Sequence, residues 1–231
     1  MIESFARILS DPHRIDMLLN GMLVTIQISL GAVLLGLIIG SIIAAFNMSN
    51  VGFTVKGKKI KPLRLIAFVY LGIIRGTPAV TQLLIISHTI FAAVRGVSVW
   101  IGIVALGINS GAYVAEIIRA GIMSIDKGQM EAGLSLGLNR TRTMIFIVMP
   151  QAIKNILPAF INEFIVLIKE TAIVGFVGIQ DINRVGQLII AQTFDVTPLF
   201  ITALMYLILI SALTMLLSLF EKRLRSSDKP A

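Results

Sequence analysis

The chain places ionisable side chains inside long apolar stretches, where such residues are rare. Arg75 lies about ten residues into one stretch, which at about 1.5 Å of rise per helical residue is near the middle of a bilayer. Lys169 and Glu170 lie at a similar depth in another stretch. Because ionisable groups within a membrane are energetically costly, they are functional candidates by default. Cationic and anionic groups on neighbouring helices are what a small zwitterion requires.

The neighbours of these residues follow helical spacing. Glu163 and Glu170 are seven residues apart and share a helix face, whereas Asn162 and Lys169 share the adjacent face. Arg75 is a candidate carboxylate ligand because a guanidinium group can bond both carboxylate oxygens. The alternative is that Arg75, Lys169 and Glu170 pair with one another and only hold the helices in register.

Two further features lie close to these charges. Pro78 follows Arg75 by three residues and is predicted to break its helix, which would free backbone groups to line a cavity. Glu116 and Arg119 are three residues apart near the end of another stretch, and this spacing favours an ion pair on one helix.

The elements that carry these residues are membrane-spanning helices. Of the 231 residues, 56% are hydrophobic and 14% are charged, whereas soluble domains have about 25% charged residues. Five apolar stretches reach the roughly 20 residues needed to span a bilayer. They are residues Leu18–Phe46, Leu65–Phe91, Val99–Ile122, Leu157–Ile179 and Pro198–Phe220. We therefore expect an all-α integral membrane protein with five transmembrane helices.

The basic residues orient these helices. The net charge is +8, and fourteen of the 20 Lys and Arg residues lie in the first connection, the third connection and the C-terminal tail. These three segments fall on the same side of a five-span chain, and the other side has only four. Because cytoplasmic loops are rich in Lys and Arg, the N-terminus is predicted to lie outside and the C-terminus in the cytoplasm.

The same pattern divides the chain into three parts. Residues 1–17 are an external or interfacial segment, with a short interfacial helix and a frayed end as equal alternatives. Residues 18–222 form the transmembrane domain, and residues 223–231 are a cytoplasmic tail. Between helices three and four, residues 124–156 fit two short helices, with Gly137 in the turn, Asn139 or Thr141 as a cap, and Pro150 ending or bending the second.

Two weaker patterns remain. Gly36 and Gly40 in the first span predict a close-packing face, for which a dimer contact is one use. The outer connection Gln180–Val196 has apolar positions that fit a short external helix, either as a gate, as a contact for a substrate-delivering protein, or simply at the interface.

The connection between helices three and four also carries a sequence motif. Residues 128–137 read GQMEAGLSLG, and nine residues later 147–152 read IVMPQA. This resembles the EAA loop of ABC importer permeases in order and spacing, with Gly133 in place of the second Ala and Met149 in place of Leu. Three further segments resemble the subfamily that imports polar amino acids. They are RGTP at 75–78, AYVAEIIR at 112–119 and NEFI with LIKET between 162 and 171, with Ala172 departing from the usual Ser.

This resemblance implies a fold and a set of roles. The fold would be type I ABC importer-like, with a cytoplasmic coupling helix between helices three and four. The coupling residues would be Glu131, Ala132, Gly133, Gly137 and Pro150. The substrate-binding candidates are Arg75, Thr77, Asn162, Glu163, Lys169 and Glu170.

The resemblance also implies partners and a place in the cell. The chain would be a multi-pass permease of the bacterial plasma (inner) membrane that translocates polar amino acids by alternating access. It would pair with a second copy or a related permease, an ABC ATPase dimer and an extracytoplasmic amino-acid-binding protein. The alternatives are the same scaffold carrying an opine or a sulfur amino acid, and a membrane assembly protein whose charge pairs are structural.

Enzymatic and nucleic-acid functions are disfavoured. Residues 52–58 fit seven positions of a phosphate-binding loop, but Lys59 replaces the Ser or Thr that holds magnesium. We therefore expect no cofactor here, with ATP and Mg²⁺ bound by the partner ATPase. His13 and His88 lack a metal-site context, and no basic-aromatic array supports nucleic-acid binding.

Overall fold

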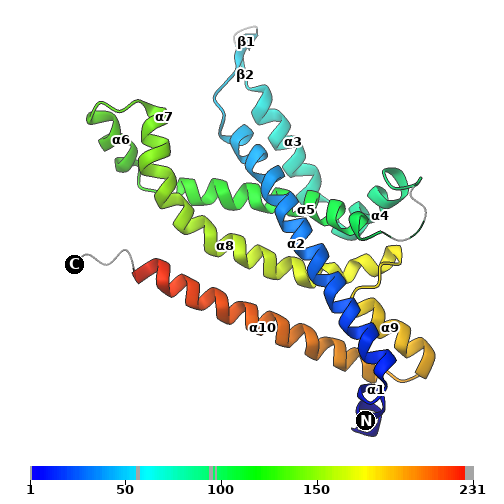
Figure 1. The fold of residues 1–231 in the computed structure, drawn as a ribbon. Coiled ribbons are helices and arrows are strands. Elements are labelled where there is room, and N and C mark those ends of the chain that lie inside the picture. Colours follow the sequence, from blue (N-terminus) through cyan, green and yellow to red (C-terminus); the bar gives the residue numbers. More distant parts are fainter. Residues whose placement is uncertain (1, 56–57, 94–95, 97, 227–231) are drawn as a thin grey trace.

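The computed structural model describes residues 2–55, 58–93, 96 and 98–226, and these are almost entirely helical (Figure 1). In chain order the elements are α1 (Ile2–Leu9), α2 (Pro12–Met48), β1 (Phe53–Val55), β2 (Lys58–Ile60), α3 (Pro62–Gly76), α4 (Ala79–Thr89), α5 (Val99–Met123), α6 (Lys127–Ser135), α7 (Arg140–Thr143), α8 (Met149–Glu170), α9 (Ile182–Thr193) and α10 (Thr197–Ser226). A π-helical turn, Met144–Val148, joins α7 to α8, and a 3₁₀ helix, Thr171–Val177, extends α8.

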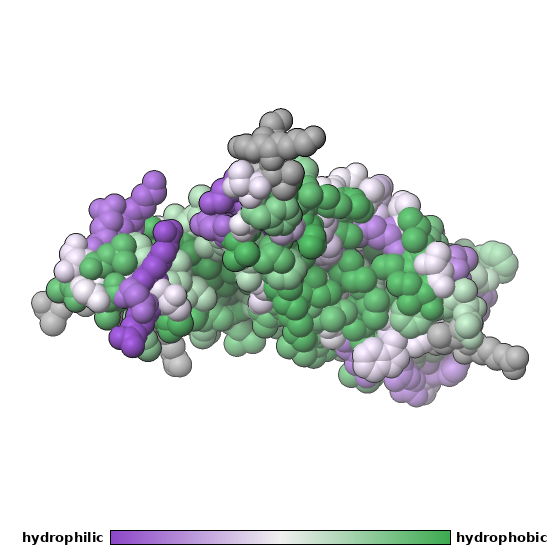
Figure 2. Space-filling view, turned by 90° about the horizontal axis from the view of Figure 1, so that it is seen from above, coloured by the Kyte–Doolittle hydropathy of each residue, from purple (hydrophilic) through white to green (hydrophobic). Residues whose placement is uncertain are grey.

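Long apolar helices dominate the described residues. Four helical segments there are long and apolar enough to cross a membrane: α2, α5, the continuous segment Arg140–Val177, and residues Thr197–Lys222 of α10. The pair α3 and α4 makes a fifth if the two are counted as one span, although they meet at 107°. Figure 2 shows apolar side chains across the middle of the visible face, with hydrophilic ones mostly toward its two ends. This distribution fits a bilayer around the middle of the molecule.

The centre of the fold is the contact between α2 and α5. An added Cβ at Gly36 would meet Ser110 and Gly111, and one at Gly40 would meet Val114. On the facing helix, Gly107 is equally crowded by Leu35 of α2. The small-residue face of α2 therefore packs against α5 of the same chain, so Gly36 and Gly40 do not serve a dimer contact.

The N-terminal segment forms a helix, α1, which packs on α2 and α10 (Figure 1). Asp11 caps α2, because its side chain accepts a hydrogen bond from the His13 amide at 3.0 Å. The first spanning helix consequently begins at Pro12 rather than at Leu18. The outer connection also contains the expected helix, α9.

The connection between α5 and α8 differs from the prediction of two separate short helices. α6 is separate, but α7 runs through the π-helical turn directly into α8. The Met149 amide bonds the Met144 carbonyl, five residues back, which widens the turn immediately before Pro150. Proline lacks an amide hydrogen and its ring collides with the preceding turn of a regular α-helix. The wider turn accommodates that ring, and therefore Pro150 neither ends the helix nor starts a new one.

Candidate functional site

Arg75 lies in the last turn of α3, at the break between α3 and α4. Thr77 is extended, with φ −126° and ψ 149°, which is the conformation that a residue before proline prefers. Pro78 then caps α4, and the chain turns by 107°. The break predicted from Pro78 is therefore present.

The break is stabilised by one buried amide side chain. Gln82 of α4 is 8% exposed, and its Nε2 donates to the Ile74 carbonyl at 2.8 Å, the Thr77 carbonyl at 3.1 Å and Thr77 Oγ1 at 2.7 Å. Its Oε1 accepts a hydrogen bond from Asn109 Nδ2 of α5 at 2.9 Å. Backbone carbonyls that the break leaves without helical partners are thus satisfied by a side chain. Thr77 belongs to this support.

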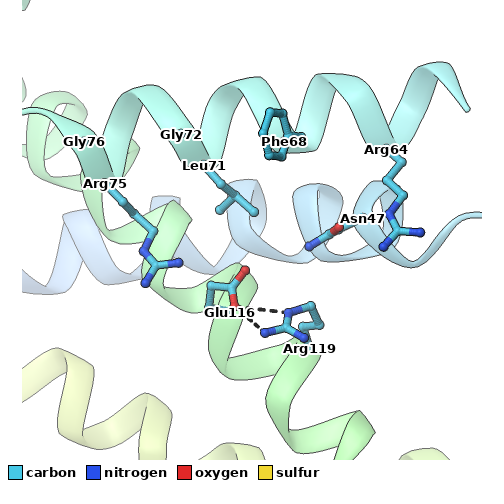
Figure 3. A pocket seen from close by; sticks show the side chains of 9 residues that line it. All are labelled: Asn47, Arg64, Phe68, Leu71, Gly72, Arg75, Gly76, Glu116 and Arg119. Atoms are coloured by element: carbon cyan, nitrogen blue, oxygen red, sulfur yellow. Dashed lines mark hydrogen bonds and ion pairs between the residues drawn. The ribbon is translucent and has the colours of Figure 1, made fainter.

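A cavity of about 560 Å³ lies between α3 and α5 (Figure 3). Figure 3 shows the side chains of Arg64 and Arg75 extending from α3 toward α5, where Glu116 and Arg119 lie. An added Cβ at Gly72 or Gly76 would have no other atom within 4 Å, so this face of α3 borders open space. The lining residues are Asn47, Arg64, Phe68, Leu71, Gly72, Arg75, Gly76, Glu116 and Arg119.

The cavity carries an excess of positive charge. Arg119 Nη2 pairs with Glu116 Oε2 at 2.7 Å, which confirms the predicted ion pair. Among the described residues, no carboxylate oxygen lies within 4.0 Å of the guanidinium group of Arg64 or Arg75. Three guanidinium groups therefore face one carboxylate, and the cavity suits an anion. An exposed arginine at this depth cannot face hydrocarbon cheaply, so this face of α3 should border water or another protein chain.

The candidates on α8 occupy a different environment. Glu163 is 8% exposed, and its carboxylate accepts a hydrogen bond from Ser110 Oγ of α5 at 2.9 Å. Asn162 and Lys169 are exposed, and Glu170 is half-buried. None of the four lines the Arg75 cavity. Within the described part of the chain, no ion pair joins Arg75, Lys169 or Glu170, so the alternative of mutual pairing is wrong for this conformation.

Three polar residues at this site escaped the sequence analysis: Gln82, Asn109 and Ser110. Each is a polar side chain in a mostly apolar helix, and this composition is the signal that the sequence offers for them. Asn109 and Ser110 are adjacent on α5, and they connect that helix to α4 and α8, respectively. The described polar groups at mid-helix depth therefore form supports on both sides of α5.

The loop predicted to be a coupling element has well-defined turns. Gly137 has φ +84°, a left-handed conformation that glycine adopts without a Cβ penalty, and the Leu138 amide donates to the Gly133 carbonyl at 3.1 Å. The Asn139 side chain caps α7 by accepting from the Arg142 amide at 2.9 Å, so the cap is Asn139 and not the alternative Thr141.

The surface of this loop is open. Glu131, Ala132 and Pro150 are exposed, whereas Gly133 is buried and its position is crowded by the side chain of Thr143. Large apolar side chains are also exposed, with Leu136 82% and Phe146 70% accessible. The loop thus presents polar and large apolar side chains that the other described residues leave exposed.

Residues 51–226 match the family described as binding-protein-dependent transport system inner membrane component. The chain belongs to this family. This permease is 38% identical over 219 residues to the protein named arginine transport system permease protein ArtQ of Bacillus subtilis (strain 168), covering 93% of this chain and 95% of that one. It is 34% identical over 215 residues to the glutamine transport system permease protein GlnP of Escherichia coli (strain K12), covering 91% and 94%.

Solved structures agree with this assignment. The crystal structure of an amino acid ABC transporter with histidines contains a chain with 41% identity and a TM-score of 0.84, covering 94% of this permease and 98% of that chain. A chain of the inward-facing MetNI methionine ABC transporter has a TM-score of 0.79 at 16% identity, covering 93% and 99%. That second likeness establishes the fold alone. The permease therefore has the type I importer-like fold expected from its EAA loop.

Proposed function

We propose that this permease carries polar amino acids across a bacterial plasma membrane by alternating access. The observation that carries the proposal is the cavity around Arg75, because it is open, large enough for a small solute and positively charged. The carboxylate of an amino acid would bind Arg75, and Glu116 is the carboxylate in the same cavity that could receive its ammonium group. The relatives named for arginine and glutamine transport support this substrate class.

The residues on α8 have a second role in this proposal. Glu163 and Glu170 would face the solute as it passes α8, while Asn162 and Lys169 would contact it from the exposed side of that helix. Glu163 is held by Ser110, so its carboxylate is oriented before any solute arrives. Thr77 would act through the break, by fixing the end of α3 that carries Arg75.

The energy for transport would come from a separate ATPase dimer. The permease carries no complete phosphate-binding loop in its sequence, since Lys59 takes the place of the magnesium-binding Ser or Thr. ATP-driven closure of that dimer would move α6 and its exposed neighbours as a rigid body, and the long helices would transmit this movement. Two permease chains, identical or related, would enclose the path, and an external binding protein would deliver the solute.

The experiment that tests substrate class is uptake by proteoliposomes containing the permease with its ATPase and binding protein. The panel should include arginine, glutamine, methionine and an opine, with ATP inside or outside the vesicles. We expect uptake of at least one polar amino acid that depends on ATP. If only an opine or no panel member stimulates ATP hydrolysis, the substrate proposal is wrong.

A second measurement tests the coupling role. Glu131→Ala and Gly137→Ala should leave the complex assembled but reduce the ATP hydrolysis that solute and binding protein stimulate. Lys222→Gln is a matched control, because Lys222 is an exposed charged residue near the end of α10 and outside the predicted coupling loop. Unchanged coupling in both loop variants would remove this loop from the ATPase contact.

A further inference from the structure

The connection between α2 and α3 is a small β-hairpin, although its sequence predicts only a basic loop. Its strands pair antiparallel, with Phe53 opposite Ile60 and Thr54 opposite Lys59. Paired residues share one face of a hairpin, and successive residues alternate between faces. Phe53 and Ile60 therefore lie on one face and Thr54 and Lys59 on the other. Phe53 is 56% exposed and Ile60 39% exposed, although both are apolar.

The hairpin is held close to the ends of two apolar helices. Four residues separate the end of α2 from β1, and Lys61 alone separates β2 from α3. Lys61 Nζ donates to Asn50 Oδ1 at 2.7 Å and ties the base together. A strand of three residues reaches only about 10 Å. Because α2 and α3 are predicted to end at the cytoplasmic surface of the bilayer, the hairpin is confined to that surface.

The charge around the hairpin has one sign. The sequence contains no Asp or Glu from Met17 to Ala115, and it places Lys56, Lys58, Lys59, Lys61 and Arg64 within a stretch of nine residues. Among these, Lys56 lies outside the described residues. Exposed apolar side chains beside clustered lysines are the pattern of segments that lie in the interface of an anionic membrane. Figure 1 shows the hairpin well separated from α6 and α7, the predicted ATPase contact.

We propose that this hairpin binds anionic phospholipid headgroups. Phe53 and Ile60 enter the interface between headgroups and acyl chains, while Lys59 on the opposite face bonds headgroup phosphates. Anionic lipid would then anchor the junction of α2 and α3, the helix that carries Arg75. The proposal does not depend on which solute the permease carries.

The test uses fluorescence quenching in the assembled transporter. Trp100 is the only tryptophan of this chain. With the ATPase's tryptophans also replaced, Trp100→Phe combined with Phe53→Trp leaves one emitter on the hairpin. The complex is reconstituted in phosphatidylcholine vesicles with increasing phosphatidylglycerol, and bromine is placed on the acyl chains of one lipid or the other. We expect stronger quenching by brominated phosphatidylglycerol than by brominated phosphatidylcholine at equal mole fraction.

Variants of Lys59 isolate the charge. Lys59→Gln should raise the phosphatidylglycerol fraction needed for half-maximal quenching by about fivefold at most, the effect of losing one basic residue near an anionic surface. Lys59→Arg should retain the wild-type preference, and Lys222→Gln should leave it unchanged. Equal quenching by the two lipids overturns the proposal. Absence of quenching by either lipid also overturns it, since the hairpin would then be covered by protein. Loss of uptake with the lipid preference intact would reject the proposed transport and not this lipid site.

Discussion

The charged groups in the cavity around Arg75 and in the buried cluster around Asp181, at the outer end of the molecule, have opposite environments. In the outer cluster, Asp181 is fully buried and accepts hydrogen bonds from the Asn183 amide, the Arg184 amide and the Tyr206 hydroxyl, at 3.0–3.1 Å. In the cavity, Arg75 is exposed and has no carboxylate within 4.0 Å among the described residues.

The difference separates structural charges from charges available to a ligand. Asp181 caps α9, bonds α10 through Tyr206, and lies next to the Ile182 amide that donates to Thr25 of α2 at 3.3 Å. Its bonding capacity is used within the chain, so it holds α9 and α10 together. The guanidinium N–H groups of Arg75 have no carboxylate partner among the described residues. The free-energy cost of placing this charge within the membrane is offset only when an anion or water occupies the cavity. Substitutions in the two regions should therefore change different measurements.

The largest expected effect is on uptake. Arg75→Leu should lower uptake by the reconstituted transporter about a hundredfold or more, because losing one partner of a charge pair costs about 2–5 kcal/mol. Arg75→Lys should recover only part of it, since lysine lacks the planar fork that bonds both carboxylate oxygens. Complex assembly and thermal stability should be unchanged. Arg7→Leu is the control, because Arg7 is an exposed arginine on α1. Normal uptake by Arg75→Leu would remove Arg75 from the site.

In the outer cluster, Asp181→Ala should act on stability instead. It removes the cap of α9 and the hydrogen bond that the Tyr206 hydroxyl donates to Asp181, for a combined loss of about 3 kcal/mol. We expect a lower thermal midpoint in detergent, measured as the temperature at which half of the purified permease is no longer monodisperse. The folded fraction should retain the KM of uptake. A changed KM with unchanged stability would make Asp181 a solute ligand and erase the contrast with Arg75.

Gln82 tests the support beneath the cavity. Gln82→Leu removes the donor to two carbonyls at the break and the acceptor of Asn109, so we expect a loss of about 2 kcal/mol in stability. Uptake should also fall, because the end of α3 that carries Arg75 would lose its fixed position. Gln187→Leu is the matched control, since Gln187 is exposed on α9. If Gln82→Leu leaves both stability and uptake unchanged, the hydrogen bonds at the break are dispensable.

Local patterns predicted the features that depend on near neighbours in sequence. The ion pair of Glu116 and Arg119 follows from their spacing on one helix, and the break at Pro78 follows from the geometry of proline. Gly137 likewise follows from the positive φ that its turn requires. The apolar stretches predicted the spanning segments, of which four are helices long enough to cross a membrane and the fifth is the bent pair α3 and α4. In each case the cause lies within a few residues.

Long-range contacts were beyond such patterns. Ser110 and Glu163 are 53 residues apart, and Gln82 and Asn109 are 27 apart, so only the packing of helices brings them together. The same holds for the separation of Arg75 from the charges on α8, because depth in a span does not determine the direction that a side chain faces. The continuous helix through Pro150 was missed for another reason. A π-helical turn leaves almost no trace in composition, although it removes the clash that proline would otherwise cause.

The smallest expected effect is the pH dependence of stability that Asp181 contributes. Burial raises the pKa of Asp181 above its ordinary value, against the opposing effect of its hydrogen bonds. The folded state therefore holds this proton more tightly than the unfolded state does. The stability contributed by Asp181 is fully present below the ordinary aspartate pKa of about 3.9 and is lost as the pH rises through the folded-state pKa.

Asp181→Asn isolates this contribution, because asparagine keeps the shape and does not titrate. The wild-type and Asp181→Asn permeases share all other titrating groups. The difference between their thermal midpoints, measured from pH 4 to pH 7, therefore reports the titration of Asp181. We expect the wild-type midpoint to fall relative to that of the variant as the pH rises. A relative rise would mean that the three hydrogen bonds outweigh burial, and that the cluster stabilises the carboxylate rather than only tolerating it. The outer cluster would then be a site built for a negative charge, as the Arg75 cavity is.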